Sequence, residues 1–190
     1  MVDRRCLRLT VVVDLRSLVR ADVLARDPVD QREEESVRRF VELFDALSDP
    51  FAEEADPVHV TASSFVVGER GMILHKHRRL GIWLQPGGHI DPGETPWDAS
   101  IRETVEETGL DVRLLDRPAD GGPPPLAHVD VHPGPRGHTH LDLRYLVGGT
   151  EADPSPPEGE SPDVAWFDFG TALQMAEPGL AGAIRMLQGM

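Results

Sequence analysis

Residues 87–110 carry the strongest local structural signals of this chain: Gly-Gly-His-Ile-Asp-Pro-Gly-Glu-Thr-Pro-Trp-Asp-Ala-Ser-Ile-Arg-Glu-Thr-Val-Glu-Glu-Thr-Gly-Leu. Thr95 is a favourable N-cap residue for a helix, and Pro96 suits the first helical position. Gly109 is a favourable terminator, because glycine adopts the left-handed conformation in which many helices end. The stretch therefore predicts a helix over residues 96–108.

A projection at about 100° per residue divides this predicted helix into two faces. The side expected to be buried carries Trp97, Ile101, Thr104, Val105 and Thr108. Three carboxylates, those of Glu103, Glu106 and Glu107, share an arc of about 100° on the opposite side, which we expect to face solvent.

These carboxylates are placed unfavourably, because they repel one another and lie near the negative end of the helix dipole. A bound hard cation such as Mg²⁺, which prefers oxygen ligands, would relieve this repulsion. A solvated acidic face is the alternative, and the helix taken alone leaves it open.

The spacing of glycine and charged residues over the whole stretch distinguishes a metal site from a solvated acidic face. Gly88 is followed after five residues by Glu94, after seven more by Arg102-Glu103, and after two more by Glu106-Glu107, before Gly109 and an aliphatic residue. This pattern resembles the Nudix box. Thr104 stands where the box usually has an aliphatic residue, and we expect its hydroxyl to bond back to its own helix.

The resemblance extends beyond the box. Residues 81–89 look like the strand and loop that lead into it, residues 59–67 like the first core strand, and Trp166 like an aromatic on a late strand. We therefore predict a Nudix hydrolase domain over residues 58–190. Residues 1–57 look like the N-terminal helical extension of a bacterial subgroup, and we expect it to pack on the core.

In Nudix hydrolases the box carboxylates bind divalent ions, which polarise a phosphoryl group and activate the attacking water. The resemblance assigns this metal-binding and catalytic role to Glu103, Glu106 and Glu107, with Mg²⁺ or Mn²⁺ as cofactor. It also implies that Glu94 and Arg102 pair and hold the loop before the helix in place.

Further site residues follow from the same resemblance. The backbone carbonyl of Gly88 is an expected metal ligand, and the Gly87-Gly88 pair lets the backbone approach the substrate closely. His89 is a candidate for contacting a substrate phosphate. Glu160, with Glu158 next, is a candidate for a further metal ligand, although each is equally well explained as an ordinary loop acid.

Strand and helix patterns alternate along the rest of the chain. Strands are predicted over residues 58–68, 72–75, 111–115, 126–132, 138–147 and 164–167, with a short apolar segment at 81–85 that Pro86-Gly87-Gly88 breaks. Helices are predicted over residues 31–49, 171–177 and 180–188. Hairpins mixed with crossovers predict an α/β protein, an α/β/α sandwich around a mixed β-sheet.

Charge and composition limit the function classes. The net charge of −14 argues against binding long nucleic acid, because such binding depends on Lys and Arg neutralising phosphates. No apolar run approaches the length of a membrane span, and Cys6, the only cysteine, excludes an internal disulfide. We expect a cytoplasmic protein with a small, phosphorylated nucleotide-type substrate, and leave open whether it forms a homodimer.

The leading hypothesis is a pyrophosphohydrolase that cleaves a diphosphate bond between a nucleoside diphosphate and another group. A catalytically silent binding or regulatory module on the same fold is the main alternative, which the intact box disfavours. An RNA-end pyrophosphohydrolase also stays open. An isopentenyl diphosphate isomerase of the same fold is set aside, because that enzyme relies on a cysteine upstream of the box.

Histidines and aromatic residues supply weaker candidates. His75 and His77, like His138 and His140, are two residues apart, so each pair points to one side of a strand. The four together would suit a transition metal, but residues that line a pocket are the more ordinary interpretation. Phe65, Trp83 and Tyr145 could stack on a base, but core packing is the simpler interpretation of each.

Overall fold

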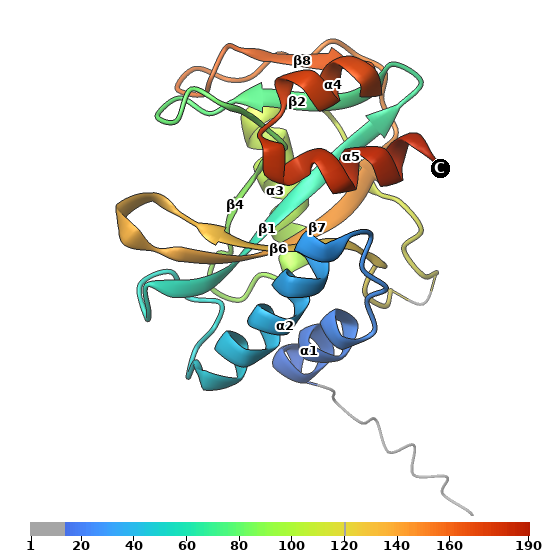
Figure 1. Ribbon diagram of the computed structural model, residues 1–190. Helices are drawn as coiled ribbons and strands as arrows, with labels where there is room; N and C mark the ends of the chain where they lie inside the picture. Colours follow the sequence, from blue (N-terminus) through green and yellow to red (C-terminus); the bar gives the residue numbers. More distant parts are fainter. Residues whose placement is uncertain (1–13, 120) are drawn as a thin grey trace, which may run out of the picture.

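The computed structural model describes residues 14–119 and 121–190, and Cys6 lies outside them. Helices enclose a mixed β-sheet, so the predicted α/β sandwich is confirmed. In Figure 1, α3 (Pro96–Thr108) lies behind the sheet, and α4 (Phe169–Met175) and α5 (Ala181–Gln188) lie in front of it. The N-terminal helices α1 (Leu15–Leu24) and α2 (Gln31–Ala46) lie beside its lower end.

Strand β1 (Val58–Gly68) is the centre of the sheet. It pairs in parallel with β7 (Thr139–Gly148) and antiparallel with β2 (Gly71–Lys76) and β4 (Gly87–His89). β6 (Leu126–Pro133) and β5 (Arg113–Leu114) pair with β7, and β3 (Trp83–Leu84) and β8 (Val164–Phe167) pair with β2. Five strands and helix α3 thus separate β1 from its parallel partner β7 along the chain.

Helix α3 forms as its local signals predict. The side chain of Thr95 accepts a hydrogen bond from the backbone of Asp98, and Gly109 caps the other end with a left-handed φ of 68°. Thr104 bonds back to the carbonyl of Ser100 at 2.7 Å, as expected. Helix α3 packs on β1, where the Ser64 hydroxyl donates to the same carbonyl at 2.9 Å.

The buried face of α3 is rotated from the predicted one. Ala99 and Ser100 are fully buried, whereas Val105, expected inside, is 43% exposed. The contact between Ser64 and α3 favours this rotation, which no pattern within the helix reveals. As a consequence Glu103 and Glu107 lie on a partly buried flank, and the prediction that all three carboxylates face solvent is wrong for these two.

The first two helices cover the outer edge of β6. The Glu33 carboxylate accepts a hydrogen bond from the backbone N–H of Val129 at 3.0 Å, and the Ser36 hydroxyl accepts one from Val131 at 3.2 Å. Arg26 donates to the carbonyl of Leu126 at 3.2 Å. Side chains thus satisfy the backbone groups that an edge strand would otherwise leave open to another chain.

Several element boundaries differ from prediction. Helix α2 ends at Ala46 rather than at residue 49, and the predicted strand over 111–115 is reduced to two residues. The largest difference is β4, because Gly87 and Gly88 extend and pair with Ser63 and Ala62 instead of only breaking a strand. A short 3-10 helix (Pro178–Leu180) joins α4 to α5. No helix in the described part of the chain is long and apolar enough to cross a membrane.

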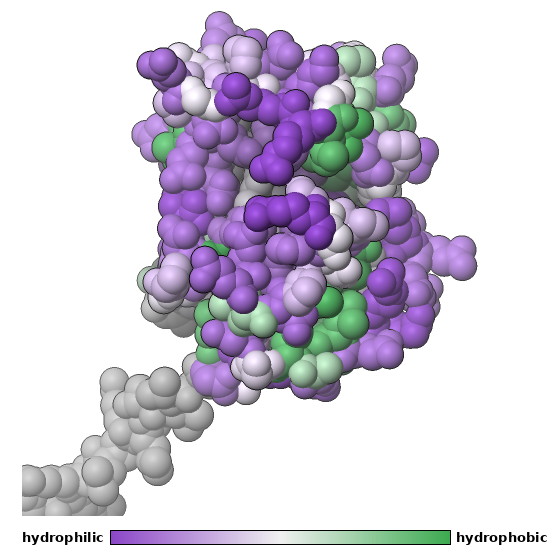
Figure 2. Space-filling view, turned by 90° about the vertical axis from the view of Figure 1, so that its left-hand side faces the viewer, coloured by the Kyte–Doolittle hydropathy of each residue, from purple (hydrophilic) through white to green (hydrophobic). Residues whose placement is uncertain are grey.

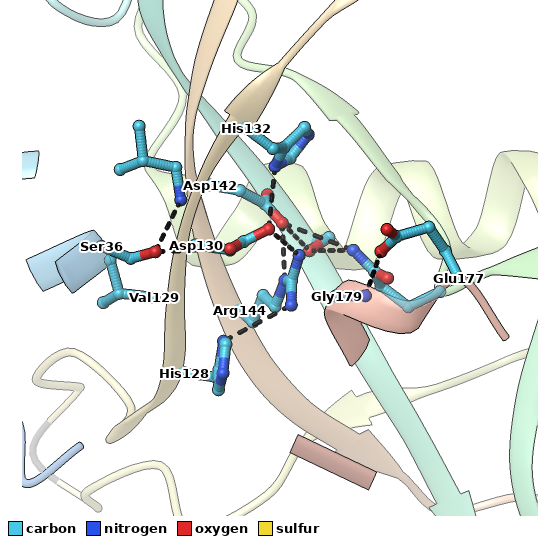
Figure 3. A network of polar contacts seen from close by, with 12 residues as sticks. Ser36, His128, Val129, Asp130, His132, Asp142, Arg144, Glu177 and Gly179 are labelled. Carbon is cyan, nitrogen blue, oxygen red and sulfur yellow. Dashed lines mark hydrogen bonds and ion pairs between the residues drawn. The ribbon is translucent and has the colours of Figure 1, made fainter. Parts of the chain in front are cut away.

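A charged network is buried between β6, β7 and α2 (Figure 3). Arg144 contacts Asp130 at 3.1 Å and Asp142 at 2.8 Å, and all three side chains are about 4% exposed or less. Arg32 of α2 reaches the same Asp130 at 3.1 Å. The two buried acids keep their pKa values low against the effect of burial, through hydrogen bonds and the positive charge of Arg144.

This network predicts a large loss of stability when one partner is removed. Asp130→Asn should lower the free energy of unfolding by about 3 kcal/mol, because Arg144 and Arg32 lose a charged partner in a buried setting. Asp45→Asn is the matched control, since Asp45 pairs with Arg20 at the surface, and it should change stability little. Urea unfolding at pH 7 measures both variants, and equal losses would contradict the assignment.

Candidate active site

The C-terminal half of α3 holds two carboxylates against strand β4. The Glu107 carboxylate accepts a hydrogen bond from the Gly87 N–H at 2.9 Å and lies 3.5 Å from the His75 ring. The Glu103 carboxylate packs on Gly88, where a Cβ would come within 2.5 Å of one of its oxygens. Only glycine permits this approach at position 88, and Glu106, 53% exposed, faces solvent beside it.

Arg102 braces the acidic cluster. Its guanidinium contacts Glu94 and Glu103 at 2.9 Å each and Glu106 at 3.2 Å, and it donates to the backbone carbonyl of His89 at 2.8 Å. The hydrogen bond to Glu94 is the main cause of a raised Arg102 pKa. The expected pairing of Glu94 with Arg102 is therefore present, and it ties the loop before α3 to the helix.

Two of the three box carboxylates are electrostatically destabilised. Burial is the main cause that raises the pKa of Glu107 to about 8, and the charges of Glu103, Glu160 and Glu106 add to it. Burial likewise raises the pKa of Glu103, against the opposing effect of Arg102. The positive charge near these carboxylates is therefore too small to offset the cost of burying their charged forms.

The loop over residues 149–163 brings a further acid toward the cluster. Ser155 donates its N–H to the carbonyl of Thr108 at 2.8 Å, which fixes the loop at the end of α3. Glu160 follows on this loop, exposed, and its charge helps to raise the Glu107 pKa. Glu158 is also exposed on the same loop.

A cavity of about 600 Å³ reaches the cluster at Glu103, the one box carboxylate among its lining residues. Gly87, Gly88 and Glu103 form part of its wall, and the β2–β3 turn and the tip of the β6–β7 hairpin border it. Figure 2 looks onto this side of the molecule, where a hollow is bordered by hydrophilic surface and a hydrophobic patch. His89 lines the same cavity, so the structure brings the three predicted substrate-contacting residues together.

One face of the sheet supplies the polar floor of this cavity. Thr61 and Ser63 donate to the buried Asp142 carboxylate at 3.1 and 2.9 Å, and Gln85 donates to Ser63 at 3.2 Å. Arg144 continues this face beyond Asp142. Sequence reasoning missed these residues, although the alternation His138, His140, Asp142, Arg144 places all four on one side of a strand.

The two histidine pairs lie in different surroundings. His75 contacts Glu107, whereas His138 and His140 contact the ring of His59, with centroids 5.2 Å away in both cases. Phe65 and Tyr145 are buried, which supports core packing as their role. Trp83 packs edge-on against Phe167.

Comparison with known proteins identifies the family. The model of the NUDIX domain matches residues 57–188. This chain belongs to the Nudix family. A Nudix-family hydrolase from Clostridium perfringens has a similar structure, with a TM-score of 0.58 and 28% identity, covering 68% of this chain and 97% of that one.

Curated relatives of this Nudix protein carry different activities in their names. An isopentenyl-diphosphate Delta-isomerase of Streptomyces avermitilis is 32% identical over 127 residues, which cover 63% of this chain and 60% of the relative. An RNA pyrophosphohydrolase of Brucella anthropi is 32% identical over 104 residues, covering 50% of this chain and 60% of the relative. The chain thus spans about three fifths of the length of each.

The raised Glu107 pKa predicts an unusual pH dependence of stability in a chelating buffer. The folded protein keeps a proton on Glu107 that the unfolded chain loses above about pH 4.5, so stability should fall as pH rises toward 8. Glu107→Gln keeps the acceptor for Gly87 and cannot ionise. It should remove a fall on the order of 2–4 kcal/mol between pH 5 and 8.

Urea unfolding at both pH values measures this effect. Glu106→Gln is the control, because Glu106 lies in solvent and its replacement should alter the pH dependence much less. A pH dependence that is the same in wild type and Glu107→Gln would show that Glu107 is not destabilised by burial.

Proposed function

We propose that this Nudix protein is a hydrolase that uses Mg²⁺ or Mn²⁺ to cleave a diphosphate linkage in a nucleotide-type substrate. The observation that carries the proposal is the set of three box carboxylates, two of them partly buried and short of positive charge, beside the Gly87-Gly88 strand at the cavity wall.

The donor set fits a hard divalent cation. Glu103, Glu106 and Glu107 offer only oxygen atoms, which Mg²⁺ and Mn²⁺ prefer. Burial, with repulsion from neighbouring acids added to it, raises the pKa of Glu107, and a bound cation would reverse both effects. We assign the metal to these three residues, with the Gly88 carbonyl and Glu160 as further ligands. When bound, the ion would polarise the phosphoryl group and lower the pKa of a water molecule.

The remaining residues of the cluster position these groups. Arg102 holds Glu94, Glu103 and Glu106 together and has its guanidinium largely occupied by carboxylates, so we propose that it orients the acids rather than binding phosphate. The Gly87 N–H fixes the orientation of Glu107. Glu94 acts through Arg102 by anchoring the loop that leads into α3.

The cavity supports a small substrate. Its volume of about 600 Å³ is within the ordinary range for small-molecule sites. Arg79, Arg136 and His89 on its wall are groups that suit phosphate oxygens. The net charge of −14 disfavours binding along an extended nucleic acid. A short 5′ end of RNA could still enter the cavity and is included among the substrates tested below.

Isomerisation of isopentenyl diphosphate is a second candidate, favoured by the name of the Streptomyces relative. The cysteine expected of that activity is missing from residues 14–119 and 121–190, and Cys6 belongs to the N-terminal segment. We therefore place hydrolysis first and include isopentenyl diphosphate in the test.

The experiment is chromatographic separation of the hydrolysis products, with Mg²⁺ and then Mn²⁺, from a panel of nucleotide sugars, ADP-ribose, dinucleoside polyphosphates, nucleoside triphosphates and 5′-triphosphorylated RNA, because cleavage of a diphosphate linkage leaves a phosphoryl group on each of the two products. Isopentenyl diphosphate is followed separately for isomerisation. Glu107→Gln and Glu106→Gln should reduce turnover by about 100-fold or more, because each removes a proposed metal ligand. Excess chelator should abolish activity, and added Mg²⁺ should restore it.

Glu42→Gln is the matched control, because Glu42 is an exposed glutamate on helix α2, and it should keep full activity. Full turnover in both box variants or in chelator would refute the proposed site. Activity on isopentenyl diphosphate alone would replace hydrolysis with isomerisation.

A further inference from the structure

Strand register gathers three histidines that are far apart in the sequence. His59 on β1 lies directly opposite His140 on the parallel strand β7. His89 on β4 lies opposite Thr61, which is two residues from His59 and so on the same face. All three side chains therefore project from one face of the sheet, with ring centroids 5.1–5.5 Å apart.

Each of these imidazoles has a buried nitrogen without a partner. The Nε2 atoms of His59, His89 and His140 are buried and form no hydrogen bond with the described residues. His59 is buried completely. An unsatisfied buried polar atom costs about 1–3 kcal/mol, so three in one place call for a common explanation.

The opposite ring nitrogens of two histidines have acceptors that orient them. Nδ1 of His59 lies 3.1 Å from the carbonyl oxygen of Asp56, and Nδ1 of His89 lies 3.2 Å from the carboxylate of Glu53. When Nδ1 donates its proton in this way, Nε2 keeps a free lone pair. Metal-binding histidines in proteins commonly have this second hydrogen bond to a carbonyl or carboxylate.

We propose that His59, His89 and His140 form a transition-metal site, distinct from the box carboxylates, for an ion of the Zn²⁺, Co²⁺ or Ni²⁺ class. Nitrogen atoms that the three rings offer lie within 4.8 Å of one another. Zn–N bonds of about 2.1 Å place tetrahedral ligands about 3.4 Å apart, so the rings need to approach by roughly 1 Å. His89, whose side chain is 38% exposed, has room for this movement.

The chemistry of the two sites differs. Imidazole nitrogens favour borderline transition metals, whereas the all-oxygen box favours Mg²⁺ or Mn²⁺. Burial is the main cause that lowers the pKa of His140 to about 3, which keeps this ring neutral and its nitrogen available at neutral pH. The site therefore does not depend on the proposed hydrolase activity.

The site opens to the cavity. Two of the three proposed ligands, His89 and His140, line it, so a metal held by the three histidines has a coordination position toward the cavity. Three protein ligands with one open position are typical of zinc sites that bind an exchangeable ligand. The exchangeable ligand we assign is an anionic oxygen, such as that of phosphate.

The test is titration of the metal-free full chain with Co²⁺, followed by the visible absorption that cobalt gains in a nitrogen-ligated site of low symmetry, and with Zn²⁺ by calorimetry. We expect one ion per chain with this spectrum, also in a variant carrying Glu103→Gln, Glu106→Gln and Glu107→Gln together. His89→Ala and His140→Ala should each weaken binding at least 10-fold. Circular dichroism and urea unfolding check that each variant is folded.

His77→Ala is the matched control, because His77 lines the same cavity outside the cluster, and it should leave binding unchanged. If His140→Ala does not fold, His89→Ala decides, since its side chain is partly exposed. The proposal is overturned if wild type binds no stoichiometric Co²⁺ or Zn²⁺, if His89→Ala binds as tightly as wild type, or if the triple box variant loses the spectrum.

Discussion

The close approach of the α3 carboxylates to the Gly87-Gly88 backbone is the constraint on which the rest of the site depends. A Cβ at position 88 would displace the carboxylate of Glu103, and a Cβ at position 87 would clash with the backbone of β1 at Ser63. Gly87 at the same time fixes Glu107 through its N–H and extends along β1. The two glycines therefore let α3, β4 and the cavity wall come into close contact.

The acids of the box and those on the floor of the cavity have pKa values shifted in opposite directions. Asp130 and Asp142 are fully buried yet well compensated by Arg144, so their pKa values stay low. Glu103 and Glu107 are partly buried as well, and burial raises their pKa values, because Arg102 offsets it only in part at Glu103 and the neighbouring acids add to it at Glu107. Removing a partner from the compensated acids should destabilise the fold, and we propose that the uncompensated ones bind a cation.

Local signals in the sequence are sufficient for α3 and its caps, whereas the pairing of Glu94 with Arg102 followed from the resemblance to the Nudix box. They are also sufficient for β1 and β8, whose bounds agree with prediction. The rotation of α3 was not predictable, because it depends on a contact between Ser64 and Ser100. Strand β4 was missed for a similar reason: Gly87 and Gly88 have no intrinsic preference for extended structure and adopt it by pairing with β1.

The histidine cluster likewise could not be predicted from local sequence, because it depends on strand pairing. The sequence places His138 and His140 on one face of a strand, but the parallel register that sets His59 opposite His140 joins residues about eighty positions apart. A direct test of the central claim is anomalous diffraction from crystals soaked in Mn²⁺. The account predicts a peak in contact with Glu103, Glu106 and Glu107; a peak only elsewhere, or none, would contradict it.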